Sequence, residues 1–174
     1  ITCQIHGIPD FREMCHNFLE QVRLLLDFDA AVFYYSDCQS LPEMKYAVCY
    51  RYSEDAAREY LEYGQENDYS RGLLLGGKKM VYRESDVFSD EERVETECYK
   101  RFCHDEGYHH NVHILPAENG RVLAKVSFYR RRGKPDFVYD DLFLLDMFQE
   151  HLALRIQRTY EEAKHHHDKL TVQE

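Results

Sequence analysis

The chain has an amphipathic segment near each end. Between Pro9 and Asp27, apolar residues recur at steps of three and four positions, which places them on one face of a helix. These residues are Phe11, Met14, Cys15, Phe18, Leu19, Val22, Leu25 and Leu26. A second stripe, between about Tyr139 and Ala163, consists of Leu142, Leu145, Phe148, Leu152 and Ile156. We therefore predict a helix in each segment, with an apolar face that needs a partner.

Five shorter segments have the pattern of β-strands. Residues 30–35 form a continuous apolar run, which predicts a central strand covered on both faces. Residues 45–52 alternate, and we expect one side to carry Tyr46, Val48, Tyr50 and Tyr52. Residues 79–83 form a brief strand. The first two segments should pair as a hairpin.

A second hairpin is predicted on either side of the turn signal Glu118-Asn119-Gly120. Its strands are residues 108–115 and 122–129. In the second of them we expect one face to carry Val122, Ala124, Val126 and Phe128.

The middle of the chain is less regular. A short helix is predicted over residues 56–63, ended by Gly64, then a loop over 67–77, and later a helix over 90–104. The full order predicts an α+β fold, in which an antiparallel sheet has the terminal helices on one face and the irregular region on the other.

Composition narrows the function classes. A chain of 174 residues is long enough for one domain with one core. Its net charge of −10 repels nucleic acid, so we do not expect this part of the protein to bind DNA. No run approaches the ~18 apolar residues of a membrane span, and the start at Ile1 has neither an initiator Met nor a signal-peptide layout. We expect a soluble, cytoplasmic fragment without membrane contact.

The element order is similar to that of a GAF domain, the small-molecule sensor fold related to PAS domains. The resemblance runs from about Asp10 to Glu162 and implies a GAF/PAS-like (profilin-like) sheet flanked by N- and C-terminal helices. It rests on Tyr82-Arg83-Glu84-Ser85-Asp86, on Gly107-Tyr108-His109-His110, on Ser127-Phe128-Tyr129-Arg130, and on Phe137 leading into Asp140-Asp141-Leu142-Phe143-Leu144-Leu145. One departure is that Asp68 is followed by Tyr69, where such sensors tend to carry Asp-Pro.

The last five residues, Leu170-Thr171-Val172-Gln173-Glu174, resemble the opening of a LuxR-type helix-turn-helix domain. Thr171 and Glu174 have the spacing of a capping box. This resemblance implies a sensor domain over residues 1–163, then a linker and the first residues of a truncated DNA-binding domain over 164–174. The chain would then be the input half of a LuxR-family transcription regulator that reaches DNA only through the missing C-terminal domain.

In the GAF arrangement, ligands lie between the sheet and the irregular middle region. The resemblance implies that an unknown small organic molecule contacts Tyr46, Tyr50, Tyr63, Asp68, Tyr69, Tyr99, Phe102 and Ser127. Further walls would come from Val48, Leu73, Val112 and Ile114. An apolar cavity with hydroxyls and one carboxylate suits such a ligand. The alternative is that these aromatic residues simply fill the core.

Other chemistry has weaker support in the sequence. Six possible metal ligands, namely Cys98, Cys103, His104, His109, His110 and His113, lack the paired spacing of zinc sites. The six cysteines are scattered, which is typical of free thiols, and only Cys103 has basic neighbours in sequence. His165-His166-His167 fits an exposed linker as well as a weak metal site. We expect no enzyme, no catalytic or metal-binding residue and no cofactor.

The two terminal helices also predict how a signal would leave the domain. Packed side by side, they can form a four-helix seam with a second copy, so we expect a homodimer. Ligand binding would bias the geometry of that dimer. Two alternatives remain open: a dimerisation and interaction module without ligand, and a cysteine-dependent redox protein of the GAF type.

Overall fold

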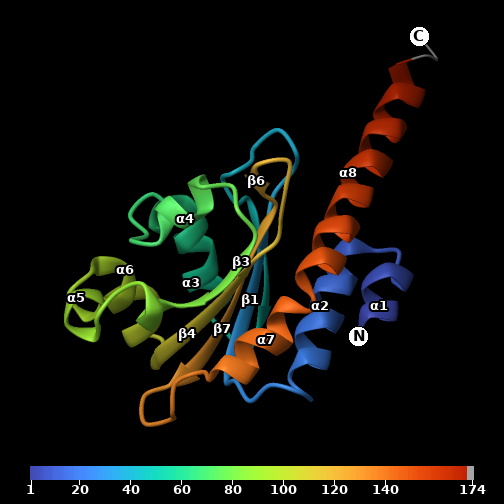
Figure 1. The fold of residues 1–174 in the computed structure, drawn as a ribbon. Coiled ribbons are helices and arrows are strands. Elements are labelled where there is room, and N and C mark those ends of the chain that lie inside the picture. Colours follow the sequence, from blue (N-terminus) through green and yellow to red (C-terminus); the bar gives the residue numbers. More distant parts are fainter. Residues whose placement is uncertain (172–174) are drawn as a thin grey trace.

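The computed structural model describes the backbone of residues 1–171 and the side chains of residues 1–164. A five-stranded antiparallel sheet, ordered β2-β1-β7-β4-β3, lies between two helical layers (Figure 1). Its strands are β1 (Ala30–Tyr35), β2 (Tyr46–Tyr50), β3 (Met80–Arg83), β4 (Tyr108–Leu115) and β7 (Ala124–Arg131). The predicted α+β fold is confirmed, and both predicted hairpin pairs, β1 with β2 and β4 with β7, are antiparallel neighbours.

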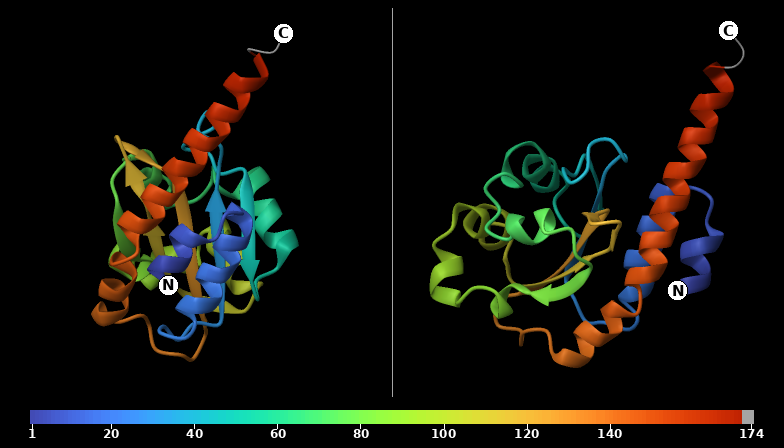
Figure 2. Two further views of the ribbon diagram at one scale, coloured as in Figure 1. Left: turned by 90° about the vertical axis from the view of Figure 1, so that its right-hand side faces the viewer. Right: turned by 45° about the horizontal axis from the view of Figure 1, so that its top comes forward.

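The helices from the two ends of the chain cover one face of the sheet, as predicted (Figure 2). They are α1 (Thr2–Gly7), α2 (Phe11–Val22), α7 (Tyr139–Asp146) and α8 (Gln149–Thr171). In this layer the Phe18 ring makes edge contacts with Phe33 of β1 and with Phe148 between α7 and α8. The structure adds α1, which packs on α2 and α8 and which the sequence pattern did not reveal.

The opposite face is covered by short, broken helices. They are α3 (Glu54–Glu59), η1 (Tyr60–Gly64), α4 (Arg71–Leu75), η2 (Glu84–Asp86), α5 (Asp90–Val94), α6 (Glu97–Tyr99) and η3 (Lys100–His104). The single helix predicted over residues 90–104 is therefore wrong. Thr96 interrupts it, because its side chain accepts a hydrogen bond from the Tyr99 N–H and caps a new helix. The predicted loop over 67–77 likewise contains α4.

Two side chains face the opposite way from the prediction. Arg51 has a left-handed backbone (φ 52°) directly after β2, and this turns Tyr52 away from the face of Tyr50. Val122 belongs to a separate two-stranded ribbon, β5 (Ala117–Glu118) with β6 (Arg121–Val122). Leu123 lies between β6 and β7 and belongs to neither strand, so the alternation of side chains between the two faces of the sheet is interrupted before β7. Both Tyr52 and Val122 pack in the core on the irregular side.

The predicted last helix is interrupted after α7 and then continues as α8 through Thr171. Leu170 and Thr171 therefore extend α8, while Val172, Gln173 and Glu174, and with them the capping box, lie outside the described residues. Within the described part of the chain, no helix combines the length and the apolar character needed to cross a membrane.

Candidate functional site

The central strands β4 and β7 carry polar side chains on the face that meets the irregular layer. In β7, Lys125 and Ser127 alternate with Val126, which packs in the core beneath the helices. In β4, Asn111 and His113 occupy the equivalent positions, and the register places His113 opposite Ser127. All four polar side chains are buried, so they must find partners inside the protein.

Lys125 and Asp68 form an ion pair in this interior. Lys125 Nζ lies 2.6 Å from Asp68 Oδ2 and donates to the Tyr60 hydroxyl at 3.1 Å. Asp68 also accepts from the Tyr60 hydroxyl at 2.6 Å and from the Ser70 hydroxyl at 2.6 Å. Burial alone would raise the pKa of Asp68, but the Lys125 ammonium and these hydrogen bonds outweigh it and hold that pKa well below its usual value. Both groups are therefore charged at neutral pH.

A second buried chain of hydrogen bonds joins Glu84, His113 and Ser127. His113 Nε2 lies 3.0 Å from Glu84 Oε1, and His113 Nδ1 lies 2.8 Å from Ser127 Oγ. Burial opposes ionisation of Glu84, yet its hydrogen bonds, first among them that from His113, keep its pKa below the usual value. Burial and the nearby Lys125 charge lower the pKa of His113. A neutral imidazole must then donate from Nε2 to the Glu84 carboxylate and accept from Ser127 at Nδ1.

Glu84 is also held by two further side chains. Asn111 Nδ2 donates to Glu84 Oε2 at 2.8 Å, and Arg93 Nη1 lies 3.4 Å from the same oxygen. Arg93 also donates to Asp90 at 2.8 Å and to the His109 carbonyl oxygen. The buried cluster thus pairs Lys125 with Asp68 and Arg93 with Glu84, and its charges balance.

Two tyrosine hydroxyls in this cluster have no hydrogen-bond partner among the described residues. The Tyr82 hydroxyl comes from β3 and lies near Ser70, and the Tyr69 hydroxyl lies near Glu84, but neither reaches hydrogen-bonding geometry. A buried hydroxyl without a partner loses free energy relative to water, about 1–3 kcal/mol.

Five of the eight residues predicted to bind a ligand lie on this side of the sheet. Asp68 and Ser127 belong to the polar network, Tyr69 lies beside Glu84, and Phe102 makes an edge contact with the Tyr60 ring at 5.4 Å. Tyr99 also packs in this core, but its hydroxyl lies 2.6 Å from His109 Nδ1, at the outer end of the layer.

The structure does not bring the other three predicted residues to this site. Tyr46 and Tyr50 share the face of Val48, beneath the terminal helices, because α2 crosses β2 on that side. The Tyr46 side chain is 49% exposed, and Tyr50 packs against the Phe28 ring at 5.7 Å. Tyr63, in η1, is 66% exposed. The larger side chains of β2 thus cover the helix-side core. Val48, Val112 and Ile114, which were predicted as further walls of the ligand site, also pack in the core beneath the terminal helices.

The six possible metal ligands of the sequence are used in different places. Cys98 and Cys103 are buried in the irregular-side core, and burial raises the pKa of both thiols, which disfavours the reactive thiolate. His113 belongs to the Glu84 network, and His110 lies 3.5 Å from Asp136. Among the described residues, no group of three or more potential ligands is arranged around a common point.

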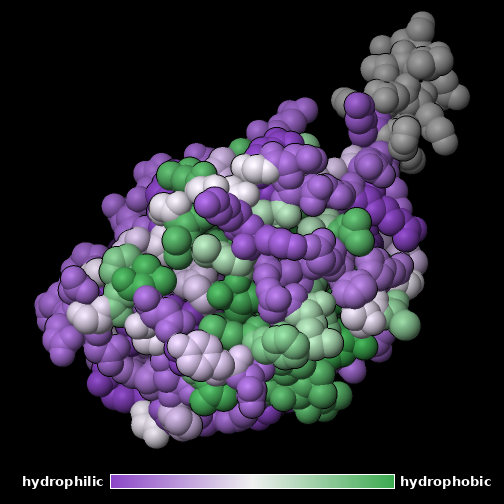
Figure 3. All heavy atoms as spheres, viewed as in Figure 1, coloured by the Kyte–Doolittle hydropathy of each residue, from purple (hydrophilic) through white to green (hydrophobic). Residues whose placement is uncertain are grey.

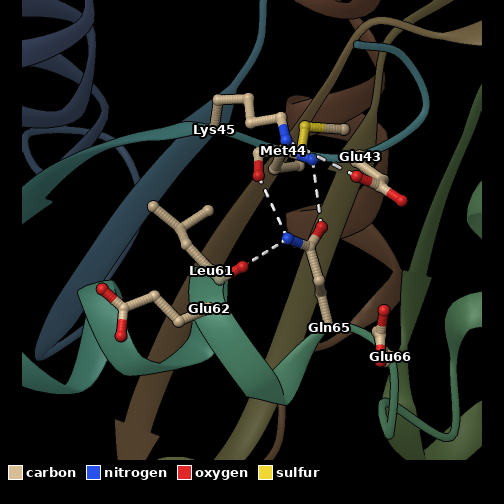
Figure 4. Close-up of a pocket in the computed structure, with 7 residues that line it drawn as sticks. All are labelled: Glu43, Met44, Lys45, Leu61, Glu62, Gln65 and Glu66. Carbon is tan, nitrogen blue, oxygen red and sulfur yellow. Dashed lines mark hydrogen bonds and ion pairs between the residues drawn. The ribbon is translucent and has the colours of Figure 1, made fainter.

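A surface hollow of about 340 Å³ lies outside this network, between the start of β2 and η1 (Figure 4). Its lining residues are Glu43, Met44, Lys45, Leu61, Glu62, Gln65 and Glu66. The Gln65 amide spans it, accepting from the Met44 N–H at 3.0 Å and donating to the Met44 carbonyl oxygen at 3.1 Å. A polar, open hollow filled by its own amide is a weaker candidate than the buried network.

Sequence reasoning missed several members of the network: Tyr60, Ser70, Tyr82, Glu84, Arg93, Asn111, Lys125 and, as a functional residue, His113. One signal was present, because Lys125 stands between Ala124 and Val126 in a strand that is otherwise apolar. A charged residue in a strand covered on both faces needs a buried partner. The identity of that partner, Asp68, depends on a contact across 57 positions.

The comparisons with known proteins concern the fold. No family model matches the chain, and no curated protein matches it in sequence. The GAF domain of a two-component sensor histidine kinase from Bacillus halodurans aligns with a TM-score of 0.61 at 14% identity, over 90% of this chain and 99% of that one. The GAF domain/HD domain protein from Geobacter sulfurreducens aligns with a TM-score of 0.64 at 13% identity, over 88% and 96% of the two chains.

The protein SdiA is also similar. Escherichia coli SdiA aligns with a TM-score of 0.55 at 15% identity, over 91% of this chain and 64% of SdiA, so the chain spans less than two thirds of that protein. SdiA in complex with octanoyl-rac-glycerol aligns with a TM-score of 0.57 at 14% identity. At these identities the likeness concerns the fold alone. The chain therefore has the GAF-like fold, an antiparallel sheet between a layer of terminal helices and an irregular layer.

Proposed function

We propose that the chain is the small-molecule-sensing and dimerisation domain of a LuxR-type transcription regulator. The observation that carries the proposal is the buried polar network between the sheet and the irregular layer, with the unpaired hydroxyls of Tyr69 and Tyr82. The similarity to SdiA, which has been crystallised with octanoyl-rac-glycerol, supports a ligand in this region and a regulator of this class. DNA binding would belong to a further domain.

The network suggests which chemistry a ligand needs. Its ionised side chains are already paired, so an additional charge would not be neutralised there. Tyr69 and Tyr82 instead offer two donors to a neutral oxygen acceptor, such as a carbonyl or ester group. Phe102 and the rest of the surrounding core are apolar and suit the body of a small organic molecule. The Asp68–Lys125 pair would fix the position of the irregular layer around it.

Native mass spectrometry of the gently purified chain tests this proposal. We expect a retained small molecule, and a thermal shift when octanoyl-rac-glycerol is added as a probe. Tyr82→Phe removes one donor and should weaken binding about tenfold, the value of roughly one hydrogen bond. Tyr63→Phe is the matched control, because that side chain is exposed. If no small molecule is retained and octanoyl-rac-glycerol causes no thermal shift, ligand sensing is contradicted.

A ligand-free dimerisation module is the second candidate. It is favoured by the internal pairing of Asp68 with Lys125 and of Glu84 with Arg93, which needs no external group. In that case Tyr82→Phe would leave the thermal stability unchanged or raise it slightly, with or without octanoyl-rac-glycerol, since it removes a buried hydroxyl without a partner.

A further inference from the structure

The first helix of the C-terminal pair, α7, has an exposed apolar face. Tyr139, Phe143 and Met147 recur every four residues and are 76%, 71% and 59% exposed. Val138, at the start of the helix, is also exposed. Apolar side chains gather over α7 in the space-filling view (Figure 3). The opposite side of α7 is already covered, because Leu145 is buried in the core. An exposed stripe of this kind marks an interaction surface more often than scattered single residues do.

The charges beside this stripe indicate what covers it. Between residues 139 and 154 the sequence has Asp140, Asp141, Asp146 and Glu150 and no Lys or Arg. Three basic side chains lie nearby: Arg130 is close to Asp141, Lys79 pairs with Glu150, and the Arg83 guanidinium, which pairs with Asp86, lies 4.9 Å from the centre of the Tyr139 ring. Asp140 and Asp146 are exposed. The surface therefore combines an apolar stripe with an acidic border formed by Asp140 and Asp146.

This combination discriminates between possible occupants. A second copy of α7 would bring the same acidic border against itself, and an anionic lipid surface or a nucleic acid would be repelled. A helix with apolar residues at steps of three and four and with Lys or Arg on either side complements both features. The acids near Phe143 would then pair with its basic residues.

We propose that the stripe of Val138, Tyr139, Phe143 and Met147 is the docking site of a basic amphipathic helix from a protein partner. Phe143, in the middle of the stripe, is the central apolar contact, and the flanking carboxylates set the orientation and the rate of association. The site is separate from the buried network on the other side of the sheet. The proposal therefore does not depend on ligand sensing.

Fluorescence anisotropy with a labelled synthetic peptide tests the proposal. The probe is an 18-residue Lys/Leu peptide whose leucines form one helical face. We expect Phe143→Ser/Met147→Ser to weaken its binding at least tenfold. Asp140→Asn/Asp146→Asn should weaken binding less and reduce its dependence on salt. Leu75→Ser/Tyr63→Ser is the matched control, since it removes two exposed apolar side chains elsewhere and should leave binding unchanged.

Three outcomes would overturn the proposal. The first is unchanged peptide binding by Phe143→Ser/Met147→Ser, with the fold verified by its urea midpoint. The second is equal binding of a peptide with the same composition but a scrambled order, because this would reflect charge alone. The third is a chain that sediments as a dimer and becomes a monomer on the Phe143 and Met147 substitutions, which would assign the stripe to a second copy.

Discussion

The ion pair of Lys125 and Asp68 links a central strand to the irregular layer at the scale of single residues. Each charge loses its hydration when it is buried, at a cost of several kcal/mol per ion. Their mutual attraction and the hydrogen bonds from Tyr60 and Ser70 offset this cost only while both partners are present. The pair therefore specifies where the segment after η1 must lie.

Removal of one charge of the pair should destabilise the folded protein more than removal of both charges. Asp68→Asn leaves the Lys125 ammonium buried without a counter-charge, and we expect a loss of about 3–5 kcal/mol of unfolding free energy. Lys125→Met in the same chain should restore a large part of that loss, because the uncompensated charge is gone. Urea unfolding of the wild type, both single variants and the double variant gives the coupling energy. Strictly additive effects would show that the two groups do not interact.

His113 should make stability depend on pH. Its pKa is lowered in the folded protein by burial and then by Lys125, so the folded state keeps the imidazole neutral. The unfolded chain takes up this proton near the ordinary value of about 6.5. Below that pH the unfolded state binds more protons, and stability falls as the pH decreases. His113→Gln should flatten this decline between pH 7 and 5, as measured by urea midpoints. His16→Gln, on the exposed side of α2, should leave the decline unchanged.

The candidate site shows what sequence alone can provide for single residues. The alternation in β4 and β7 separates the two faces, but it does not say which face meets the irregular layer. The resemblance implied that Tyr46 and Tyr50 face that layer, whereas the packing of α2 on β2 requires them on the helix side. Asp68 was found through the resemblance, and its partner Lys125 was not.

At the scale of elements, two glycines connect the irregular layer with the β5–β6 ribbon. Gly77 has a φ of 66°, and a Cβ added there would lie 2.0 Å from the Gly120 carbonyl oxygen. Gly120, in the turn after Asn119, also has a positive φ of 74°. Backbones approach this closely only where a side chain is missing. The contact fixes the segment that leads from α4 into β3.

Gly77→Ala should therefore reduce the stability of the protein by more than the strain of a left-handed backbone alone. The matched variant is Gly107→Ala, where φ is 84° but no atom lies within 4 Å of the added Cβ. We expect about 1–2 kcal/mol for Gly107→Ala, from backbone strain, and a clearly larger loss for Gly77→Ala, from strain plus the clash with Gly120. Thermal unfolding compares the two. Equal losses would mean that the ribbon moves aside without cost.

At the scale of the whole molecule, the sequence pattern predicts the arrangement of the layers better than the boundaries of the helices within them. The stripes of the terminal helices and the apolar run of β1 predicted a covered sheet, because amphipathic periodicity reports burial directly. The broken helices between Asn67 and His104 were not predicted. Their boundaries depend on single capping residues such as Thr96 and on contacts with the sheet, which periodicity does not encode.

The proposed homodimer through the first and last helices belongs to this scale. Because α1 packs on α2 and α8, it covers part of the expected seam. Leu154, on α8, remains exposed and is a candidate contact with a second copy. We expect Leu154→Glu to shift the chain from dimer to monomer in sedimentation, and Leu75→Glu, an exposed leucine on α4, to have no effect. A monomeric wild-type chain at high concentration would contradict the dimer.

The helix α8 extends well past the body of the protein (Figure 1). Ile156 is buried in the core, and the helix continues to Thr171, about 22 Å further along its axis at 1.5 Å per residue. One part of the helix is therefore held in the core, while the other part projects away from it. A tilt of about 5° at Ile156 displaces the far end by roughly 2 Å, so a change in packing too small to disturb the sheet is enlarged at the far end of the helix.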